Sequence, residues 1–272
     1  MAVISILIIA VTLLACDFAR RTIRHYFEPS LSRSLVLDFV ITIELCTGSF
    51  ELGVILENYG VWVWSVGLYL LAFYQCSRWQ GFTMPTPLLH FLDSITGHAT
   101  WKEAAMRTLV LLASGWMTYQ YISAVWRLEL STFHSQRPEK VAACSIPWKE
   151  LETYKCFLAE VIGSFVLGIG PQLVSDNPTL SNNDPVVTAG INAALVTVTV
   201  VAVLDISGGM FNPMLASILL GGCTGHSWIQ HILVYWIGAA LGTLAAFKVY
   251  PTIKEMVYPV HFQIGEETKK DL

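Results

Sequence analysis

The sequence predicts an all-α membrane protein: an inverted repeat of two three-span halves, two half-helices that meet at the membrane midplane, and an N-terminal hydrophobic helix. Three observations predict this fold. Of 272 residues, 54% are hydrophobic and only 13% are charged, against roughly 25% charged residues in soluble domains. Long apolar stretches alternate with short polar ones, as expected of membrane spans. Proline-initiated apolar segments follow Thr86 and Asn212, at equivalent places in the two halves.

Composition also excludes several classes of function. The net charge of -4 shows no basic excess, so no nucleic-acid partner is expected. The cysteines lie far apart without a Cys-x-x-Cys pair, which predicts neither a zinc site nor a disulfide framework. No nucleophile–base pair or metal cluster is recognisable at the depth of the spans. We therefore expect no enzymatic activity, cofactor or metal.

An apolar stretch at residues 2–16 is followed by Arg20, Arg21 and Arg24. A signal peptide carries its positive charge before the apolar segment, so this order predicts an uncleaved helix. The stretch is short for a span, and whether it crosses the membrane stays open. The basic residues up to position 33 are expected on the cytosolic side.

The first repeat is expected at residues 34–130, with spans at 34–57, 61–78 and 103–126. The first span carries Asp38, Glu44 and Glu51, and carboxylates at such depth are kept only where they find partners. Before the third span, Thr86 supplies an N-cap, Pro87 suits the first helical position, and Leu88 continues an apolar run to residue 97. This pattern predicts a half-helix at 86–97.

After a connecting loop at 131–150, the second repeat is expected at residues 151–250, followed by a cytosolic tail at 251–272. Its half-helix is predicted at 212–222. Asn212 is the cap, Pro213 takes the first helical position, and two glycines at 221 and 222 should end the helix in left-handed conformations. About ten residues at ~1.5 Å each give ~15 Å, half of a ~30 Å hydrocarbon core.

The two halves repeat one pattern. The interval from an early buried acid to the half-helix cap is 48 residues from Asp38 to Thr86 and 52 from Glu160 to Asn212. Because each half has three spans, an odd number, the second copy must be inserted upside down. The half-helices then enter from opposite faces and meet N-terminus to N-terminus.

Two opposed positive helix ends would repel cations, exclude protons and orient the oxygen of a passing water molecule toward the caps. Asn212 can cap with its carbonyl oxygen and offer two N–H donors, whereas Thr86 can donate once. Asp38 and Glu160 are expected to accept hydrogen bonds from backbone N–H groups of the adjoining loops. Asp205 is grouped with them as a loop-supporting residue.

The second half resembles the aquaporin (major intrinsic protein) family in three ordered segments, Ala159–Phe165, Asp205–Met214 and Val234–Gly242. The unorthodox intracellular superaquaporins, of the aquaporin-11/12 type, are the most similar subgroup. The chain shares with them the N-terminal hydrophobic segment, Val36–Phe39, Ser123–Trp126 and a cysteine after the second half-helix. The resemblance covers most of residues 10–250. It implies a channel for water and small neutral solutes, assembled as a homotetramer in the lipid bilayer.

The pore motifs depart from this family. Each family half-helix begins Asn-Pro-Ala, whereas here the second reads Asn212-Pro213-Met214 and the first Thr86-Pro87-Leu88. The alternative register for the first motif is Met84-Pro85-Thr86. Threonine caps helices and methionine does not, which favours the register that begins at Thr86.

The expected selectivity filter departs as well. The family's filter arginine corresponds to Leu215, and the histidine of water-selective members corresponds to Val200. Val66 is the candidate for the aromatic position of the second span. We expect a wider, apolar constriction, in which passage of glycerol or hydrogen peroxide is as expected as fast water flux.

Several other residues carry alternatives. His90, one turn after Thr86, could act as a pH gate, although a solvated side chain is the favoured interpretation. Cys223 could form a crosslink, sense oxidants, or simply pack at a helix end. Gly238 and Gly242 predict close helix packing within the chain.

The chain ends with Lys269 and Lys270 at the fourth and third positions from the end. This resembles the dilysine signal that returns membrane proteins to the endoplasmic reticulum, and a solvated basic tail is the alternative. The signal needs a cytosolic C-terminus. Six spans after a cytosolic basic stretch predict the same.

Two rival functions remain at this point. An ion-coupled transporter would use Asp38, Glu44 and Glu160 as a carboxylate relay. A nonconducting scaffold is suggested by the altered first cap and the missing filter arginine.

Overall fold

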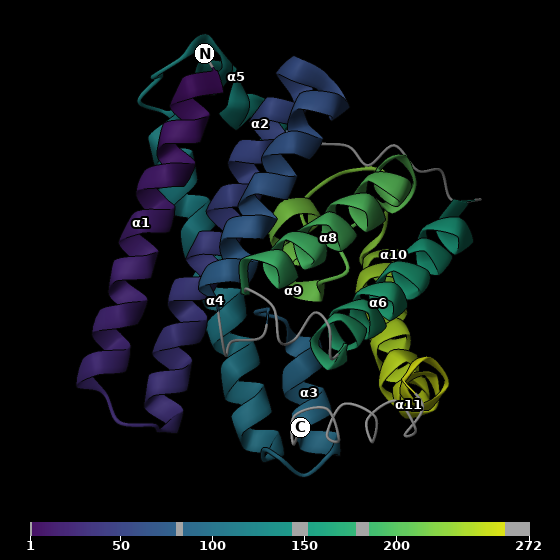
Figure 1. Cartoon of the computed structure of the whole chain (residues 1–272). Coiled ribbons are helices and arrows are strands. Elements are labelled where there is room, and N and C mark those ends of the chain that lie inside the picture. The colour runs from purple at the N-terminus through teal and green to yellow at the C-terminus, as the bar shows by residue number, and fades with distance from the viewer. Residues whose placement is uncertain (1, 80–83, 143–151, 178–184, 259–272) are drawn as a thin grey trace.

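The computed structural model describes residues 2–79, 84–142, 152–177 and 185–258, and all regular elements in these ranges are helices (Figure 1). The chain is an all-α membrane protein. Its helices are α1 (Ala2–Tyr26), α2 (Leu31–Arg78), α3 (Pro87–Ile95), α4 (Trp101–Trp126), α5 (Thr132–Ala142), α6 (Thr153–Asp176), α8 (Pro185–Ser207), α9 (Pro213–Leu220), α10 (Trp228–His231), the π-helix η2 (Ile232–Gly238) and α11 (Ala239–Val257).

Among the described residues, five helical segments are long and apolar enough to cross a membrane: α1, α2, α6, α8 and the continuous run Trp228–Val257. The N-terminal stretch thus forms a helix of 25 residues rather than a short apolar piece. The expected third span is a helix of 26 residues, α4, but it is too polar to be counted among the five.

α2 is two antiparallel helices joined at Gly60. Gly60 has φ 78° and ψ 176°, outside the helical region. A Cβ at Gly48 would lie 2.6 Å from Leu71, and one at Gly67 would lie 2.8 Å from Leu52. Both pairs are centred on Gly60, so the chain reverses there. The first two expected spans are therefore separate helices.

α11 and η2 pack closely against α6. A Cβ at Gly242 would overlap the carbonyl oxygen of Val161, and one at Gly238 would lie 3.2 Å from Phe157. Small residues here let the helix backbones approach each other. This confirms the close packing predicted for Gly238 and Gly242.

Each half-helix contacts helices of the opposite half. In the main core, Met214 and Leu215 of α9 pack with Cys46 and Phe50 of α2 and with Leu111 of α4. α3 in turn contacts α11 as well as α4. This hydrophobic cluster, which contains residues of both halves, holds α9 in place.

Both half-helices begin where the sequence predicts. α9, however, does not end at glycines in the left-handed conformation. Gly97, with φ 79°, follows α3 as a left-handed terminator. α9 ends at Leu220, and Gly221 has the ordinary helical φ of -64°. Gly222 does not have a positive φ either. The left-handed termination predicted for Gly221 and Gly222 is wrong. Lys269 and Lys270 lie outside the described residues.

Candidate functional site

The N-terminal ends of the two half-helices meet. The Asn212 side-chain nitrogen donates a hydrogen bond of 2.9 Å to the carbonyl oxygen of Pro85, the residue before the cap of α3. Thr86 caps α3 by accepting from the Leu88 N–H at 3.4 Å. The first pore motif thus uses the Thr86 register rather than the Met84 register. We call the contact between Pro85–Thr86 and Asn212 the half-helix junction.

The Asn212 amide joins the two halves as well as capping α9. Its oxygen accepts from the N–H groups of Met214 and Leu215 at 3.1 and 3.4 Å. Because one amide hydrogen bonds Pro85, a single hydrogen is left for a solute, not the two that the sequence suggested. Asn212 is fully buried and Thr86 is 6% exposed.

Glu160 on α6 holds the loop that leads into α9. One carboxylate oxygen accepts from the Ser207 hydroxyl at 2.7 Å and the Met210 N–H at 3.1 Å, and the other from the Phe211 N–H at 2.7 Å. Glu160 is fully buried. It therefore satisfies backbone donors that lipid cannot satisfy, which is the contact expected of it from the sequence.

The same loop needs glycine on the facing helix. Phe211 has a positive φ of 48°, unusual for a bulky residue. Its ring occupies the space above Gly163 of α6, where a Cβ would overlap the ring. Gly163 therefore makes room for the last residue before the Asn212 cap.

Ser207, rather than Asp205, supports the loop from its α8 side. Asp205 is exposed, and its side chain has no hydrogen bond to another described residue. Ser207 is buried, bonds Glu160, and receives at its carbonyl oxygen a 2.7 Å hydrogen bond from the Tyr235 hydroxyl. The loop-supporting role predicted for Asp205 is therefore wrong.

Asp38 bonds a guanidinium instead of backbone N–H groups. Arg107 of α4 contacts both carboxylate oxygens, at 2.7 and 2.9 Å. His90 of α3 is 2% exposed, with its Nε2 3.7 Å from Asp38. The backbone contacts predicted for Asp38 and the solvated His90 are both wrong, because α4 and α3 fold over this acid.

Replacing Arg107 by glutamine should lower the free energy of unfolding by about 3 kcal/mol, because it leaves Asp38 buried without its counter-charge. The double variant Asp38→Asn/Arg107→Gln should recover much of this loss. Thermal unfolding in detergent, followed by tryptophan fluorescence, measures both. Equal losses in the single and double variants would contradict the pairing.

Glu44 and Glu51 also have partners that are remote in the chain. Glu44, fully buried, forms an ion pair with Arg20 of α1 and accepts from the Trp79 indole N–H at 3.0 Å. Glu51 accepts from the Trp126 indole at 2.7 Å and lies 3.1 Å from His134 of α5. Sequence reasoning missed these partners, since it sought basic residues only within the spans.

The three expected filter positions are not brought together. Leu215 of α9 packs in the core with residues of α2 and α4. Val200 is partly buried against a different cluster, which contains Leu52 and Trp64. Val66 is 60% exposed on α2. Val66 thus does not contribute to a constriction with the other two.

Met214, in the place of the family's alanine, points away from the junction. It is fully buried, and its sulfur lies 3.9 Å from Cys46 Sγ. A Cβ at Gly115 of α4 would lie 3.4 Å from the same sulfur. The same Cβ would lie only 2.6 Å from Ile218 of α9, so Gly115 makes room for Ile218 rather than for Met214. Leu88, the equivalent residue of α3, is 8% exposed.

Cys223, shortly after α9, is disulfide-bonded. The sequence left this open and predicted no disulfide framework. Cys16, Cys46, Cys76 and Cys156 are free thiols. A crosslink follows directly after the second half-helix, as one of the alternatives for Cys223 proposed.

These features define an integral, multi-pass helical membrane protein in which two half-helices meet. No family model matches the chain. It is 25% identical to an aquaporin-11 of Milnesium tardigradum, over 90% of this chain and 86% of the relative. It is 27% identical to the aquaporin-11 of Rattus norvegicus (91% and 88%) and of Homo sapiens (90% and 87%). Shorter matches reach human aquaporin-12 sequences. The chain is thus similar to the aquaporin family over most of its length, and within that family to the aquaporin-11/12-like superaquaporin group.

Proposed function

We propose that the chain is a passive channel for water and small neutral solutes. The half-helix junction carries this proposal: Asn212 Nδ2 lies 2.9 Å from the Pro85 carbonyl oxygen. A helix N-terminus is equivalent to roughly +0.5 of a unit charge. Two such ends facing each other repel cations, protons included, and leave neutral solutes as the species that pass.

The choice among neutral solutes depends on the constriction. The filter arginine of the aquaporin family corresponds to Leu215 in this chain, and the filter histidine of water-selective members corresponds to Val200. Leu215 and Val200 lie in different clusters, but neither side chain can donate a hydrogen bond that would select water over larger solutes. We therefore include glycerol and hydrogen peroxide among the proposed solutes.

The carboxylates do not favour an ion-coupled transporter. Asp38 is held by Arg107, Glu44 by Arg20, and Glu160 by three donors of its loop. An acid that must release and regain a proton at each cycle would break such contacts each time.

A nonconducting scaffold is the second candidate, and one observation favours it. Asn212 and Met214 are both fully buried, and Thr86 is nearly so. In this conformation the caps serve to join the two halves. A scaffold would keep the junction closed permanently, whereas a channel must let solute reach the remaining amide hydrogen of Asn212.

The proposed topology places residues 20–33 in the cytosol and the loop after α9 on the opposite side. The disulfide at Cys223 suits an oxidising compartment such as the endoplasmic reticulum lumen. Lys269 and Lys270, as a dilysine signal, would return the protein to that membrane. A homotetramer is proposed from the resemblance to aquaporins.

Purified protein in liposomes should speed osmotic shrinkage or hydrogen peroxide entry relative to empty liposomes, without passing protons. Stopped-flow light scattering measures water and glycerol flux, a trapped peroxide reporter measures peroxide, and a trapped pH dye measures protons. Traces that match empty liposomes for every solute would favour the scaffold. Solute flux that needs a proton gradient would favour the transporter.

A further inference from the structure

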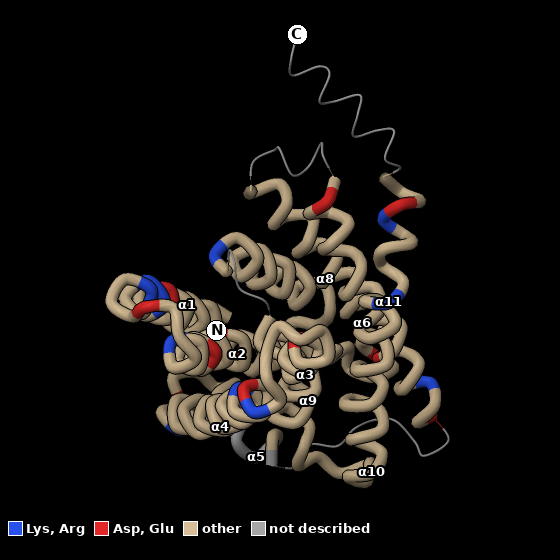
Figure 2. Tube along the Cα trace, turned by 90° about the horizontal axis from the view of Figure 1, so that it is seen from below, with Lys and Arg blue, Asp and Glu red and all other residues tan. Residues whose placement is uncertain are grey.

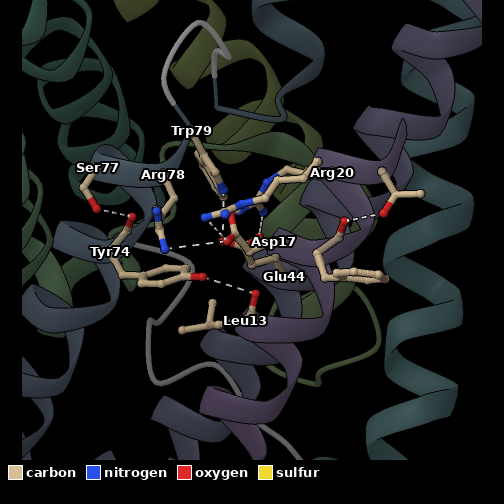
Figure 3. A network of polar contacts seen from close by, with 11 residues as sticks. Leu13, Asp17, Arg20, Glu44, Tyr74, Ser77, Arg78 and Trp79 are labelled. Atoms are coloured by element: carbon tan, nitrogen blue, oxygen red, sulfur yellow. Dashed lines mark hydrogen bonds and ion pairs between the residues drawn. The ribbon is translucent and has the colours of Figure 1, made fainter. Parts of the chain in front are cut away.

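A basic cavity lies between the end of α1 and the end of α2, away from the half-helix junction. Its volume is about 200 Å³. One water molecule occupies a share of about 30 Å³ in the liquid, so the cavity has room for a small anion with several waters. We call it the arginine pocket, and its lining residues are Asp17, Arg20, Arg21, Arg24, Ser77 and Arg78. Figure 3 labels Asp17, Arg20, Ser77 and Arg78 among them.

The arginine pocket carries an excess of positive charge. Asp17 is shared by three guanidinium groups, from Arg20 at 3.2 Å, Arg21 at 2.8 Å and Arg78 at 3.7 Å. Four arginines line the pocket against one carboxylate. Even when the buried Glu44 is set against Arg20, positive charges outnumber negative ones by two. A soluble anion or an anionic headgroup would restore the balance.

Arg20 is buried and held in place in the pocket, whereas Arg21 and Arg78 are accessible from outside. The side chain of Arg20 is only 3% exposed, held between Asp17 and Glu44. Glu44 is itself oriented by the Trp79 indole N–H at 3.0 Å. The side chains of Arg78 and Arg21 are 45% and 62% exposed. A ligand can therefore reach the outer arginines while the inner one is already positioned, which reduces the ordering cost of binding.

The pocket also lies where headgroups would be found. Arg20, Arg21 and Arg24 occupy the last two turns of α1, directly after its apolar part. Tyr26 and Phe27 follow and are 75% and 50% exposed, as is typical of aromatic residues at a membrane surface. Figure 2, viewed toward this end, shows Lys and Arg positions around the ends of α1, α2 and α4.

We propose that the arginine pocket binds a phosphate-bearing anion, either the phosphorylated headgroup of a membrane lipid or free phosphate. Guanidinium groups bind phosphate oxygens through paired N–H donors, and several arginines around one cavity suit a group with three or four such oxygens. A basic pocket between membrane helices is also the kind of site that holds anionic lipid headgroups. Binding would link α1 to the end of α2.

The test uses the full-length protein in a neutral detergent. Thermal unfolding is followed by tryptophan fluorescence during titration with dioctanoyl phosphatidylinositol 4-phosphate, with dioctanoyl phosphatidylcholine, or with sodium phosphate. The phosphoinositide or phosphate should raise the unfolding midpoint, because a ligand that binds only the folded state stabilises it. Phosphatidylcholine, which has no net charge, should not.

The double variant Arg21→Gln/Arg78→Gln should raise the half-saturating ligand concentration about tenfold or more, since two headgroup contacts are lost. Arg33→Gln is the matched control. It removes one positive charge, as the single variant Arg21→Gln does and half as many as the double variant, at the same end of the bundle, where Arg33 bonds the Phe27 carbonyl oxygen outside the pocket. Arg20 is not substituted, because its loss would leave the buried Glu44 without its counter-charge.

A response to the phosphoinositide alone identifies the lipid as ligand, and an equal response to sodium phosphate identifies the free anion. The proposal is overturned if neither raises the midpoint, or if the double variant responds as the wild type does. If the double variant does not fold, the single variant Arg21→Gln, at a mostly exposed side chain, replaces it. An unchanged half-saturating concentration in Arg21→Gln would then overturn the proposal.

Discussion

Replacing Glu160 by alanine is expected to lower the free energy of unfolding by about 3 kcal/mol or more. The change removes the acceptors of the Ser207 hydroxyl and of the Met210 and Phe211 N–H groups, all at 3.1 Å or less. Each buried donor left without a partner costs about 1–3 kcal/mol. The loop before Asn212 should lose its fixed shape, and solute flux should fall with it.

Glu152→Ala is the matched control, because Glu152 is 46% exposed and its only described ion pair is with Lys155 at 3.4 Å. Such surface pairs contribute about 0–1 kcal/mol. Thermal unfolding of both variants in detergent, followed by tryptophan fluorescence, makes the comparison. Equal midpoints in the two variants would contradict the role assigned to Glu160.

The second large effect is expected at Gly163. An alanine Cβ there would overlap the Phe211 ring. The ring cannot simply move aside, because the Phe211 N–H is bonded to Glu160 and its φ is already 48°. We expect Gly163→Ala to cost about 1–3 kcal/mol, the usual range for overpacking. It should also displace the start of α9 and reduce solute flux in proteoliposomes.

A second substitution tests the cause. Gly163→Ala/Phe211→Ala removes the ring and should recover part of the lost stability. Gly190→Ala is the matched control on α8, where the nearest atom to the new Cβ is 3.6 Å away, an ordinary contact. If Gly163→Ala unfolds at the same temperature as Gly190→Ala, the account of the Phe211 packing is wrong.

Features encoded by local sequence could be predicted well. A capping side chain followed by proline predicts a helix start from two adjacent residues, and both Thr86 and Asn212 are N-caps. The turn at Gly60 falls between two apolar runs, and the two expected spans are separate helices. Each of these features depends on residues within one or two turns of each other.

Features that depend on distant contacts could not be predicted. Arg107 is 69 residues from Asp38, and His134 is 83 residues from Glu51. A charge in one helix does not reveal which helix will fold over it. The direction in which a side chain points from its helix could not be predicted either. Residues two apart point in nearly opposite directions at 3.6 residues per turn, so Ser207 faces the loop while Asp205 is exposed.

The most direct measurement of the central claim is the solute permeability of proteoliposomes that contain the variant Asn212→Asp. Aspartate still caps α9, but it replaces the hydrogen-bond donor at the junction by a negative acceptor facing the Pro85 carbonyl oxygen. Asn58→Asp is the matched control, because Asn58 also donates to a backbone carbonyl, that of Val54 at 2.8 Å, outside the junction. We predict that stopped-flow traces of the wild type and Asn58→Asp exceed empty liposomes, and that Asn212→Asp returns to the empty value. Wild-type flux equal to that of empty liposomes, or Asn212→Asp flux equal to the wild type, would contradict conduction through the half-helix junction.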